Sequence, residues 1–318
     1  MRQRLFRLAS SATLATLVLV TSGFRLAPAV PADGTVPRGV TGHVIVISID
    51  GLRPDAIAGA GAQVLERMLR EGAGSLTART ILPSKTLPSH TSMLTGVPPE
   101  VHGITWNTDQ TDAHGYVQAE TVFELAKRAG YGTAAFFSKD KLRHLAKPGS
   151  LDHWQAPRGL SVYGADETVE AAVRYMRFRK PGLMFVHVAE PDAAGHSVGW
   201  MSAGYRWAVR RADAAVGQIL RAADATYGAG NYTVIVTADH GGTGRDHGED
   251  TNEDVQIPWI AWGAGVQPGP LTGDISTMDT ATTVLWLLGV PEPIAWAGRQ
   301  VAAAYTRAAQ ITAQAAVN

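Results

Sequence analysis

Aspartate and histidine side chains recur at three places where an apolar segment of the chain ends. They are Asp50, Asp192, His196, Asp239 and His240. Each place has an alternative explanation, since Asp before Gly often forms a turn and side chains four residues apart can share a surface hydrogen bond. Taken together, the three places offer only carboxylate oxygens and imidazole nitrogens, which suit zinc in a catalytic site.

A single hydroxyl group stands out in the segment ILPSKTLPSHTSMLTG, residues 81–96. Thr86 lies between Lys85 and a Leu-Pro-Ser-His turn, just ahead of a short apolar segment. Nothing within this segment explains the threonine. Its role depends on whether the carboxylates and histidines elsewhere in the chain meet at its hydroxyl.

The elements that would position these side chains alternate between strand and helix. Apolar runs predict strands over residues 43–50, 132–137, 183–188, 232–237 and 257–262, and helical spacing is found over residues 55–71, 121–128, 167–178, 203–225 and 278–288. This alternation predicts an α/β fold with a mainly parallel central sheet and helices on both faces. Ligands of such folds gather at the carboxyl ends of the strands, so we expect the three acidic sites at one end of the sheet.

The first 29 residues differ from the rest of the chain. Arginines at positions 2, 4 and 7 precede an apolar run over residues 8–20, and Ala27-Pro28-Ala29 offers a small-residue cleavage site. This pattern predicts a secretory signal peptide over residues 1–29, because the run is shorter than the roughly 20 residues of a membrane span. Residues 30–318 would then be a single catalytic domain without a stable membrane anchor, exported to the periplasm or the external medium.

Composition narrows the classes of function. The chain contains no cysteine, which excludes disulfides and thiolate metal sites. Loss of the signal peptide would remove four arginines and no acid, leaving 24 basic side chains against 28 acidic ones. That balance disfavours the binding of long nucleic acid through a basic face.

Four segments, in order, resemble the signature segments of the nucleotide pyrophosphatase/phosphodiesterase family of the alkaline phosphatase superfamily. They are VISIDGLRPD, LPSKTLPSHTSMLTGVPPEVHGITWN, EPDAAGHSVG and TADHGG. The resemblance extends from residue 44 to about residue 242. It implies an alkaline-phosphatase-like fold and a site with two zinc ions.

The resemblance also implies roles for individual residues. One zinc ion would be held by Asp50, Asp239 and His240 and would contact the hydroxyl of Thr86, which becomes the nucleophile at the start of a helix over residues 89–94. Asn107, which closes the segment HGITWN, would donate to a non-bridging phosphoryl oxygen.

The second zinc ion would be held by Asp192, His196 and a further histidine. Larger members of the family take that histidine from about a hundred residues after the Asp-His pair, and here the only histidine after His240 is His247. We therefore assign His247 as the third ligand. If His247 pointed to solvent, the second ion would keep only two protein ligands.

The remaining histidines and tryptophans have other interpretations. His90 and His102 are expected to order the turns around Thr86, and His187 to be a hydrogen-bonded histidine of the core. Trp106 and Trp200 are candidates to line a pocket for an aromatic leaving group.

The function predicted from the sequence is a two-zinc phosphodiesterase that hydrolyses small phosphate diesters through a phosphothreonine. The alternatives are a phosphomonoesterase or phosphonate hydrolase with the same metals, and an exported zinc- or phosphate-binding protein without turnover. A sulfatase is disfavoured, because Thr86 and His90 stand where its formylglycine precursor and its arginine would be. Substrate choice is assigned to residues 109–118 and 149–163, and no motif fixes the oligomeric state.

Overall fold

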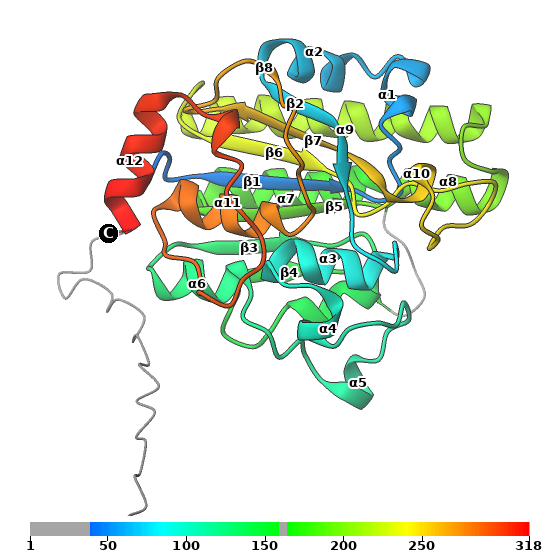
Figure 1. Ribbon diagram of the computed structural model, residues 1–318, viewed down its shortest axis with the longest axis horizontal. Helices are drawn as coiled ribbons and strands as arrows, with labels where there is room; N and C mark the ends of the chain where they lie inside the picture. The colour runs from blue at the N-terminus through cyan, green and yellow to red at the C-terminus, as the bar shows by residue number, and fades with distance from the viewer. Residues whose placement is uncertain (1–38, 159–163, 318) are drawn as a thin grey trace, which may run out of the picture.

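One eight-stranded sheet runs through the molecule, with its strands in the order β4-β3-β5-β1-β6-β7-β2-β8 (Figure 1). The structure is a computed structural model, and it describes residues 39–158 and 164–317. The predicted signal peptide, residues 1–29, lies outside the described residues. The strands are β1 (Val44–Ile49), β2 (Ala73–Arg79), β3 (Thr133–Phe136), β4 (His153–Gln155), β5 (Leu183–Val188), β6 (Thr233–Thr237), β7 (Gln256–Gly263) and β8 (Gly269–Pro270).

The centre of the sheet is parallel. Strand β1 pairs in parallel with both β5 and β6, so that Val44 lies opposite Leu183 on one side and Thr233 on the other. All residues of these three strands are buried, as expected for strands covered on both faces. Strand β7 runs antiparallel to both β6 and β2. The predicted mainly parallel sheet is therefore confirmed, with an antiparallel strand that the sequence pattern did not indicate.

Helices pack in two groups. Helices α1 (Asp55–Ala60), α2 (Gln63–Glu71), α7 (Ala165–Arg179) and α8 (Glu190–Val198) contact the long α9 (Ala203–Tyr227), whereas α3 (Thr86–Thr95), α6 (Val122–Arg128) and α11 (Asp279–Leu288) contact one another in front of the sheet in Figure 1. The other elements are α4 (Pro99–His102), α5 (Thr111–His114), η1 (Asp140–Leu145), α10 (Asn252–Val255), η2 (Ala302–Ala304) and α12 (Arg307–Val317). None of the described helices is long and apolar enough to span a membrane.

Two helix predictions need correction. The helix expected over residues 55–71 is two helices, because Gly61 adopts a left-handed conformation with φ of 67° and its N–H caps α1. The helix expected over residues 89–94 begins earlier, at Thr86. Pro88 does not prevent this, because the first-turn position that it occupies has no helical partner for an N–H group.

Strands β2, β4 and β8 were not predicted from the sequence. Strand β2 mixes buried and exposed residues without strict alternation, and its pairing with β7 shifts register between Ser75 and Ala78.

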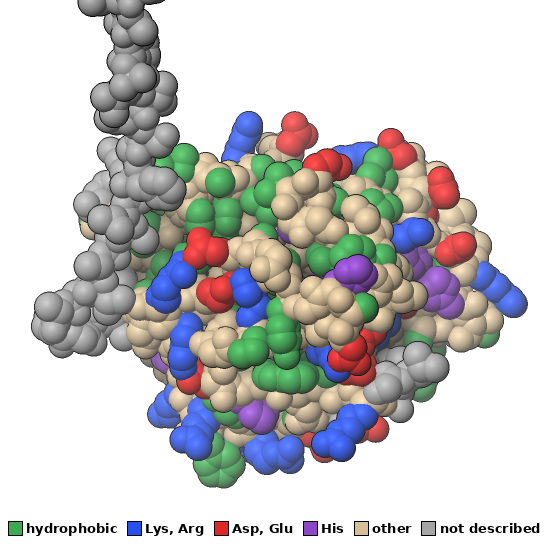
Figure 2. Space-filling view, turned by 90° about the horizontal axis from the view of Figure 1, so that it is seen from below, with side chains coloured by type: hydrophobic (Ala, Val, Ile, Leu, Met, Phe, Trp, Pro, Cys, Tyr) green, Lys and Arg blue, Asp and Glu red, His purple; other side chains and the backbone are tan. Residues whose placement is uncertain are grey.

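On the surface, basic and acidic side chains lie among one another over the face that Figure 2 shows. This agrees with the equal numbers of basic and acidic residues in the chain, 28 of each.

Candidate metal centre and nucleophile

The carboxyl ends of three neighbouring strands bring the acidic residues together. Asp50 follows β1, Asp192 lies in the first turn of α8 after β5, and Asp239 follows β6. The N–H of Asp192 donates to the backbone oxygen of Asp50 at 3.0 Å. Gly51 allows this close approach, because a Cβ atom there would lie 2.9 Å from the Cα of Asp192.

Two groups of potential ligands result, and both are buried. Asp50, Asp239 and His240 form the first group, and Asp192, His240 and His247 the second, with the ligand atoms of each group within 4.8 Å of one another. His240 is common to both groups. The Nε2 of His240 lies 3.2 Å from Asp239 Oδ2 and 3.5 Å from Asp50 Oδ1. Since one lone pair binds one ion, we assign His240 to the first group.

Three histidines present a nitrogen lone pair to this region. The Nδ1–H groups of His240, His247 and His196 donate to the backbone oxygens of Gly241, Ser84 and Arg245, at 2.8, 2.8 and 2.9 Å. Each Nε2 is therefore left as an acceptor. This is the arrangement that metal-ligating histidines adopt, with the second ring nitrogen held by a carbonyl.

In each of the three carboxylates, one oxygen accepts a hydrogen bond or forms an ion pair with Lys139, and the other accepts no hydrogen bond from the described residues. Asp239 Oδ1 accepts the N–H groups of Gly51 and His240, both at 3.0 Å, and the Oδ2 atoms of Asp50 and Asp192 face the ammonium of Lys139. The other oxygens, Asp50 Oδ1, Asp192 Oδ1 and Asp239 Oδ2, are buried without a hydrogen-bond partner within the described part of the chain.

The unpaired atoms make this centre suited to cations. Lone pairs of three imidazoles and three carboxylates converge, and a buried acceptor without a donor is costly. Bound divalent metal ions would satisfy them, and the nitrogen and oxygen donor set fits zinc. The residues present thus fit a metal centre.

The two histidines assigned to the second zinc ion, His247 and His196, differ in exposure, and His196 is not among the residues of the second group. The side chain of His247 is only 4% exposed and stacks on His240 with ring centroids 3.6 Å apart, so it does not point to solvent. Its Nε2 is 3.7 Å from Asp192 Oδ1. The side chain of His196 is 43% exposed, and its Nε2 lies 3.3 Å from the same oxygen. His196 therefore stands at the open edge of the centre.

Thr86 opens helix α3 directly beside the first group. Its side chain is fully buried, and Oγ1 lies 3.4 Å from His240 Nε2. The N–H of Leu87, in the first turn of α3, donates to Asn107 Oδ1 at 3.1 Å. Lys141 donates to the same oxygen at 3.0 Å. Because Asn107 Oδ1 already accepts two hydrogen bonds, the amide nitrogen of Asn107 is the atom that can contact a ligand.

Sequence reasoning missed Lys139, which links the two groups. Its ammonium lies 2.7 Å from Asp50 Oδ2 and also pairs with Asp192. Lys139 follows β3, the strand next to β5, so the rule that located Asp50 and Asp239 could have located it as well.

His187 was interpreted as a hydrogen-bonded core histidine, and the structure gives it a more specific partner. Its Nδ1 accepts the N–H of Ser138 at 3.2 Å, so its Nε2–H donates to Asp50 Oδ2 at 2.8 Å. His187 therefore holds one oxygen of a candidate ligand and leaves the other free.

Burial and neighbouring charges shift the pKa values of the aspartates and of His240 in the centre. Burial, and next the charge of Asp50, raise the pKa of Asp239 well above its ordinary value. Burial would raise the pKa of Asp50 too, but the ammonium of Lys139 and the hydrogen bond from His187 hold that pKa well below its ordinary value. Burial, followed by the charge of His247, lowers the pKa of His240 to about 3, so its imidazole is neutral.

The other singled-out residues lie around the centre. His90 donates from Nδ1 to the backbone oxygen of Thr86 at 2.8 Å, and His102 pairs with Ser92 of α3 at 3.0 Å. Trp200 is buried, and its Nε1–H donates to the oxygen of Gly51. Trp106 is half-buried beside His114.

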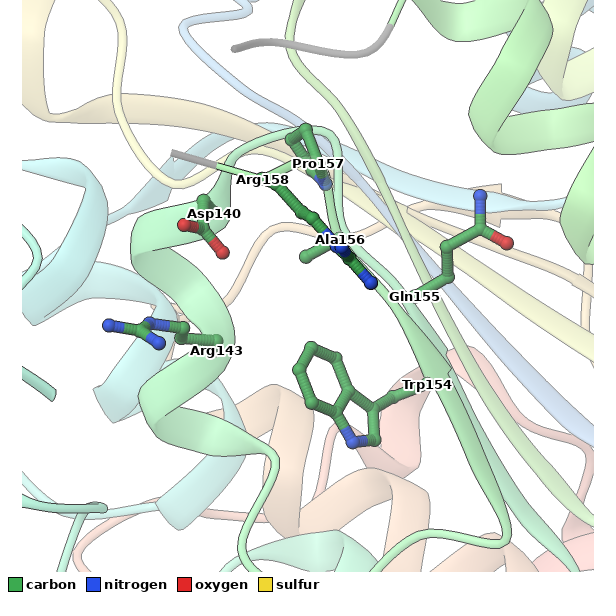
Figure 3. Close-up of a pocket in the computed structure, with 7 residues that line it drawn as sticks. All are labelled: Asp140, Arg143, Trp154, Gln155, Ala156, Pro157 and Arg158. Carbon is green, nitrogen blue, oxygen red and sulfur yellow. The ribbon is translucent and has the colours of Figure 1, made fainter. Parts of the chain in front are cut away.

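An open pocket lies elsewhere, between η1 and strand β4. Its volume is about 590 Å³, and Figure 3 shows the indole of Trp154 facing Arg143 and Asp140 across it. Asp140 adjoins Lys139, and Trp154 is 41% exposed. Residues 154–158 of its lining belong to the segment over residues 149–163, to which substrate choice was assigned.

Comparison with known proteins assigns the family. Residues 44–273 match the sequence profile of type I phosphodiesterase / nucleotide pyrophosphatase. The chain belongs to this family. The predicted membership is thereby confirmed, and a hydrolase that acts on phosphate esters is the class of enzyme that the family suggests.

Curated relatives of this phosphodiesterase family member are distant and longer. Ectonucleotide pyrophosphatase/phosphodiesterase family member 3 of Bos taurus is 24% identical over 223 residues, which are 62% of this chain and 24% of that protein. GPI ethanolamine phosphate transferase 1 of Homo sapiens is 22% identical over 304 residues, 79% of this chain and 32% of that protein. The chain thus spans about a quarter to a third of the length of these relatives.

Solved structures show the same fold for this family member. Murine ectonucleotide pyrophosphatase/phosphodiesterase 5, solved in complex with AMP, aligns with a TM-score of 0.69 at 17% identity and covers 79% of this chain and 96% of its own. A 2-O GAG sulfatase aligns with the same TM-score and identity, over 82% of this chain and 73% of its own. The structure therefore has an alkaline-phosphatase-like fold, as predicted.

Proposed function

We propose that this protein is an exported phosphodiesterase of the nucleotide pyrophosphatase type, with two zinc ions and Thr86 as nucleophile. One observation carries the proposal: three imidazole lone pairs and three carboxylate oxygens, unpaired within residues 39–158 and 164–317, converge beside the buried hydroxyl of Thr86. Such a set of acceptors needs cations, and cations next to a hydroxyl are the means by which a threonine becomes a nucleophile.

The proposed ligands divide between the two ions. Asp50, Asp239 and His240, with the hydroxyl of Thr86, would hold the first zinc ion. Asp192, His196 and His247 would hold the second. When bound, such ions lower the pKa of a coordinated hydroxyl and stabilise the entering and leaving oxygens of an in-line displacement.

The chain's own residues supply the rest of the reaction. The Thr86 oxygen attacks phosphorus as the bond to the leaving oxygen breaks, and a phosphothreonine forms. Water then attacks that phosphorus and restores the Thr86 hydroxyl. The amide nitrogen of Asn107 donates to a non-bridging oxygen, and the N-terminus of α3 favours the negative charge.

The substrate in this proposal is a small phosphate diester or nucleotide. The AMP bound to the murine relative supports a nucleotide, since that protein has the same fold. A phosphomonoesterase or phosphonate hydrolase with the same centre is the second candidate, and a zinc- or phosphate-binding protein without turnover is the third.

A comparison of two substrates, together with two threonine variants, tests the proposal. Protein reconstituted with zinc should hydrolyse bis(p-nitrophenyl) phosphate faster than p-nitrophenyl phosphate. Thr86→Ala should lower turnover at least about a thousandfold and keep its zinc, because the nucleophile and its neighbours act as a unit. Thr95→Ala, at the other end of the same helix, is the matched control and should stay active. Turnover that survives in Thr86→Ala would remove Thr86 from the mechanism, and a faster monoester would favour the second candidate.

A further inference from the structure

Four cationic side chains follow strand β3, and three of them are paired with acids. Lys139 pairs with Asp50 and Asp192, Arg143 with Asp109 and Asp112, and Lys147 with Glu124. Lys141 is the exception. Its ammonium forms no ion pair with any carboxylate in the described part of the chain, and its contacts are the side-chain and backbone oxygens of Asn107, at 3.0 and 3.3 Å.

A partly buried ammonium group such as that of Lys141 is energetically unfavourable without an anionic partner. Lys141 is half-buried, and burial together with the charge of Lys139 lowers its pKa to about 8. Neutral oxygens compensate a partly desolvated charge only in part. A bound anion would supply the missing partner. The position of the Lys141 ammonium therefore indicates where a ligand would carry negative charge.

The ammonium stands next to the place where the reacting phosphoryl group would bind. Lys141 and the N–H of Leu87 both contact Asn107 Oδ1, and Leu87 is the residue after Thr86. Lys141 is thus one side chain away from the proposed nucleophile. The charges of Asp50, Asp192 and Asp239 also act on Lys141, which places it within the field of the metal centre.

Resting on the proposed function, we propose that Lys141 binds a second negative charge on the substrate, directly beside the scissile phosphorus. A simple diester carries one charge on phosphorus, and Asn107 with the metal centre already accounts for it. The substrates favoured by Lys141 carry an additional anionic oxygen within a few bonds of that phosphorus. That oxygen belongs either to the same phosphoryl group, as in a monoester dianion, or to a neighbouring phosphoryl group, as in a nucleoside triphosphate.

The charge of Lys141 can be separated from its hydrogen bond by two substitutions. Lys141→Gln keeps a donor toward Asn107 and loses the charge, whereas Lys141→Arg keeps the charge. Lys147→Gln is the matched control, since that lysine lies on the same segment and pairs with Glu124. Each zinc-loaded protein is assayed with bis(p-nitrophenyl) phosphate, p-nitrophenyl phosphate and ATP.

Lys141→Gln should lower kcat/KM for an anionic substrate about 10- to 100-fold more than for bis(p-nitrophenyl) phosphate, as expected for loss of a charge-assisted hydrogen bond. A selective loss with p-nitrophenyl phosphate places the second charge on the reacting phosphoryl group, and a selective loss with ATP places it on the leaving group. Lys141→Arg should retain most of the selectivity. An equal loss with all three substrates would overturn the proposal, because Lys141 would then only orient Asn107.

A binding measurement keeps this inference separate from the proposed function. In a Thr86→Ala background, calorimetry should give a Kd for inorganic phosphate or for pyrophosphate that rises about 10- to 100-fold on adding Lys141→Gln and stays unchanged on adding Lys147→Gln. Absence of turnover with every ester would defeat the proposed function but leave this measurement valid. An unchanged Kd in Lys141→Gln for both inorganic phosphate and pyrophosphate would defeat the inference alone, because the first tests a second charge on the same phosphoryl group and the other a charge on its neighbour.

Discussion

The two sides of helix α3 hold buried histidines in opposite surroundings. We call the side of α3 that carries Thr91 and Ser92 the rear side, and the side that carries Thr86 the metal side. On the rear side, His102 accepts the N–H of Ile104 and donates to Ser92, and His144 pairs with Thr91, each contact at 3.0 Å. On the metal side, His240 and His247 present lone pairs to carboxylate oxygens that have no hydrogen-bond partner among the residues that the structure describes. The rear side is complete without a ligand, whereas the metal side is a set of acceptors.

The difference separates residues that stabilise the fold from residues that serve the ligand. Burial lowers the pKa of both rear histidines to about 4, and hydroxyl groups of α3 satisfy them as neutral rings. On the metal side, burial and mutual repulsion among acids raise the pKa of Asp239. A substitution on the metal side should therefore impair function more than stability, and a substitution on the rear side the reverse.

The largest effect is expected for Asp239→Asn. The asparagine oxygen can still accept the N–H groups of Gly51 and His240, while the new amide can donate to the His240 lone pair 3.2 Å away. Zinc-dependent turnover should fall by about a thousandfold or more, in line with the several kcal/mol that a catalytic metal ion supplies. The metal-free protein should melt at a higher temperature than metal-free wild type, because a crowded negative charge is gone.

Asp213→Asn is the matched control for that prediction. Asp213 is a buried acid on α9 whose two oxygens accept the N–H groups of Val64 and Leu65, far from the metal centre. Its variant should melt lower and keep its zinc and turnover. A metal-free Asp239→Asn protein that melts below wild type would contradict the charge-crowding argument.

His247→Ala should cause a smaller loss, of about one zinc ion per chain. Asp192 and His196 alone would remain for the second ion, whereas the first group keeps all of its assigned ligands. Metal analysis of the purified protein after dialysis measures the stoichiometry. His102→Ala, from the rear side of α3, should retain both ions and lose thermal stability instead. A full complement of zinc in His247→Ala would exclude His247 as a ligand.

The smallest effect is the contribution of the rear side to the dependence of stability on pH, which adds to that of buried histidines on the metal side such as His240. His102 and His144 have pKa values of about 4 when folded and about 6.5 when unfolded, so the unfolded chain binds more protons between these values. Stability should therefore fall as the pH drops from 6.5 to 4, by up to about 1.4 kcal/mol per pH unit for each histidine. Urea titrations of metal-free protein measure it, and His102→Gln should reduce the slope. An unchanged slope would mean that His102 is not buried as a neutral ring.

The sequence predicted the parts of the fold that follow from local pattern. Strand β5 occupies the predicted residues 183–188, because a continuous apolar run can be buried on both faces of a parallel sheet. The sequence also predicted that the acids after β1, β5 and β6 lie together at the carboxyl ends of these strands, since neighbouring parallel strands end on the same side of the sheet. Local pattern was not sufficient for residues 55–71, where a single glycine in a left-handed conformation divides one amphipathic stretch into two helices.

Only the tertiary structure decided which side chains meet in the centre and in what state. His187 donates to Asp50 across 137 residues of sequence, and Asp239 accepts the N–H of Gly51 across 188. Residue types alone indicated zinc chemistry, but the tautomer of each histidine, the bound oxygen of each carboxylate and the contact of Lys141 with Asn107 depend on residues that lie far away in the chain. The physical reason is that hydrogen bonding and burial are set by neighbours in space, whereas the sequence specifies neighbours along the backbone.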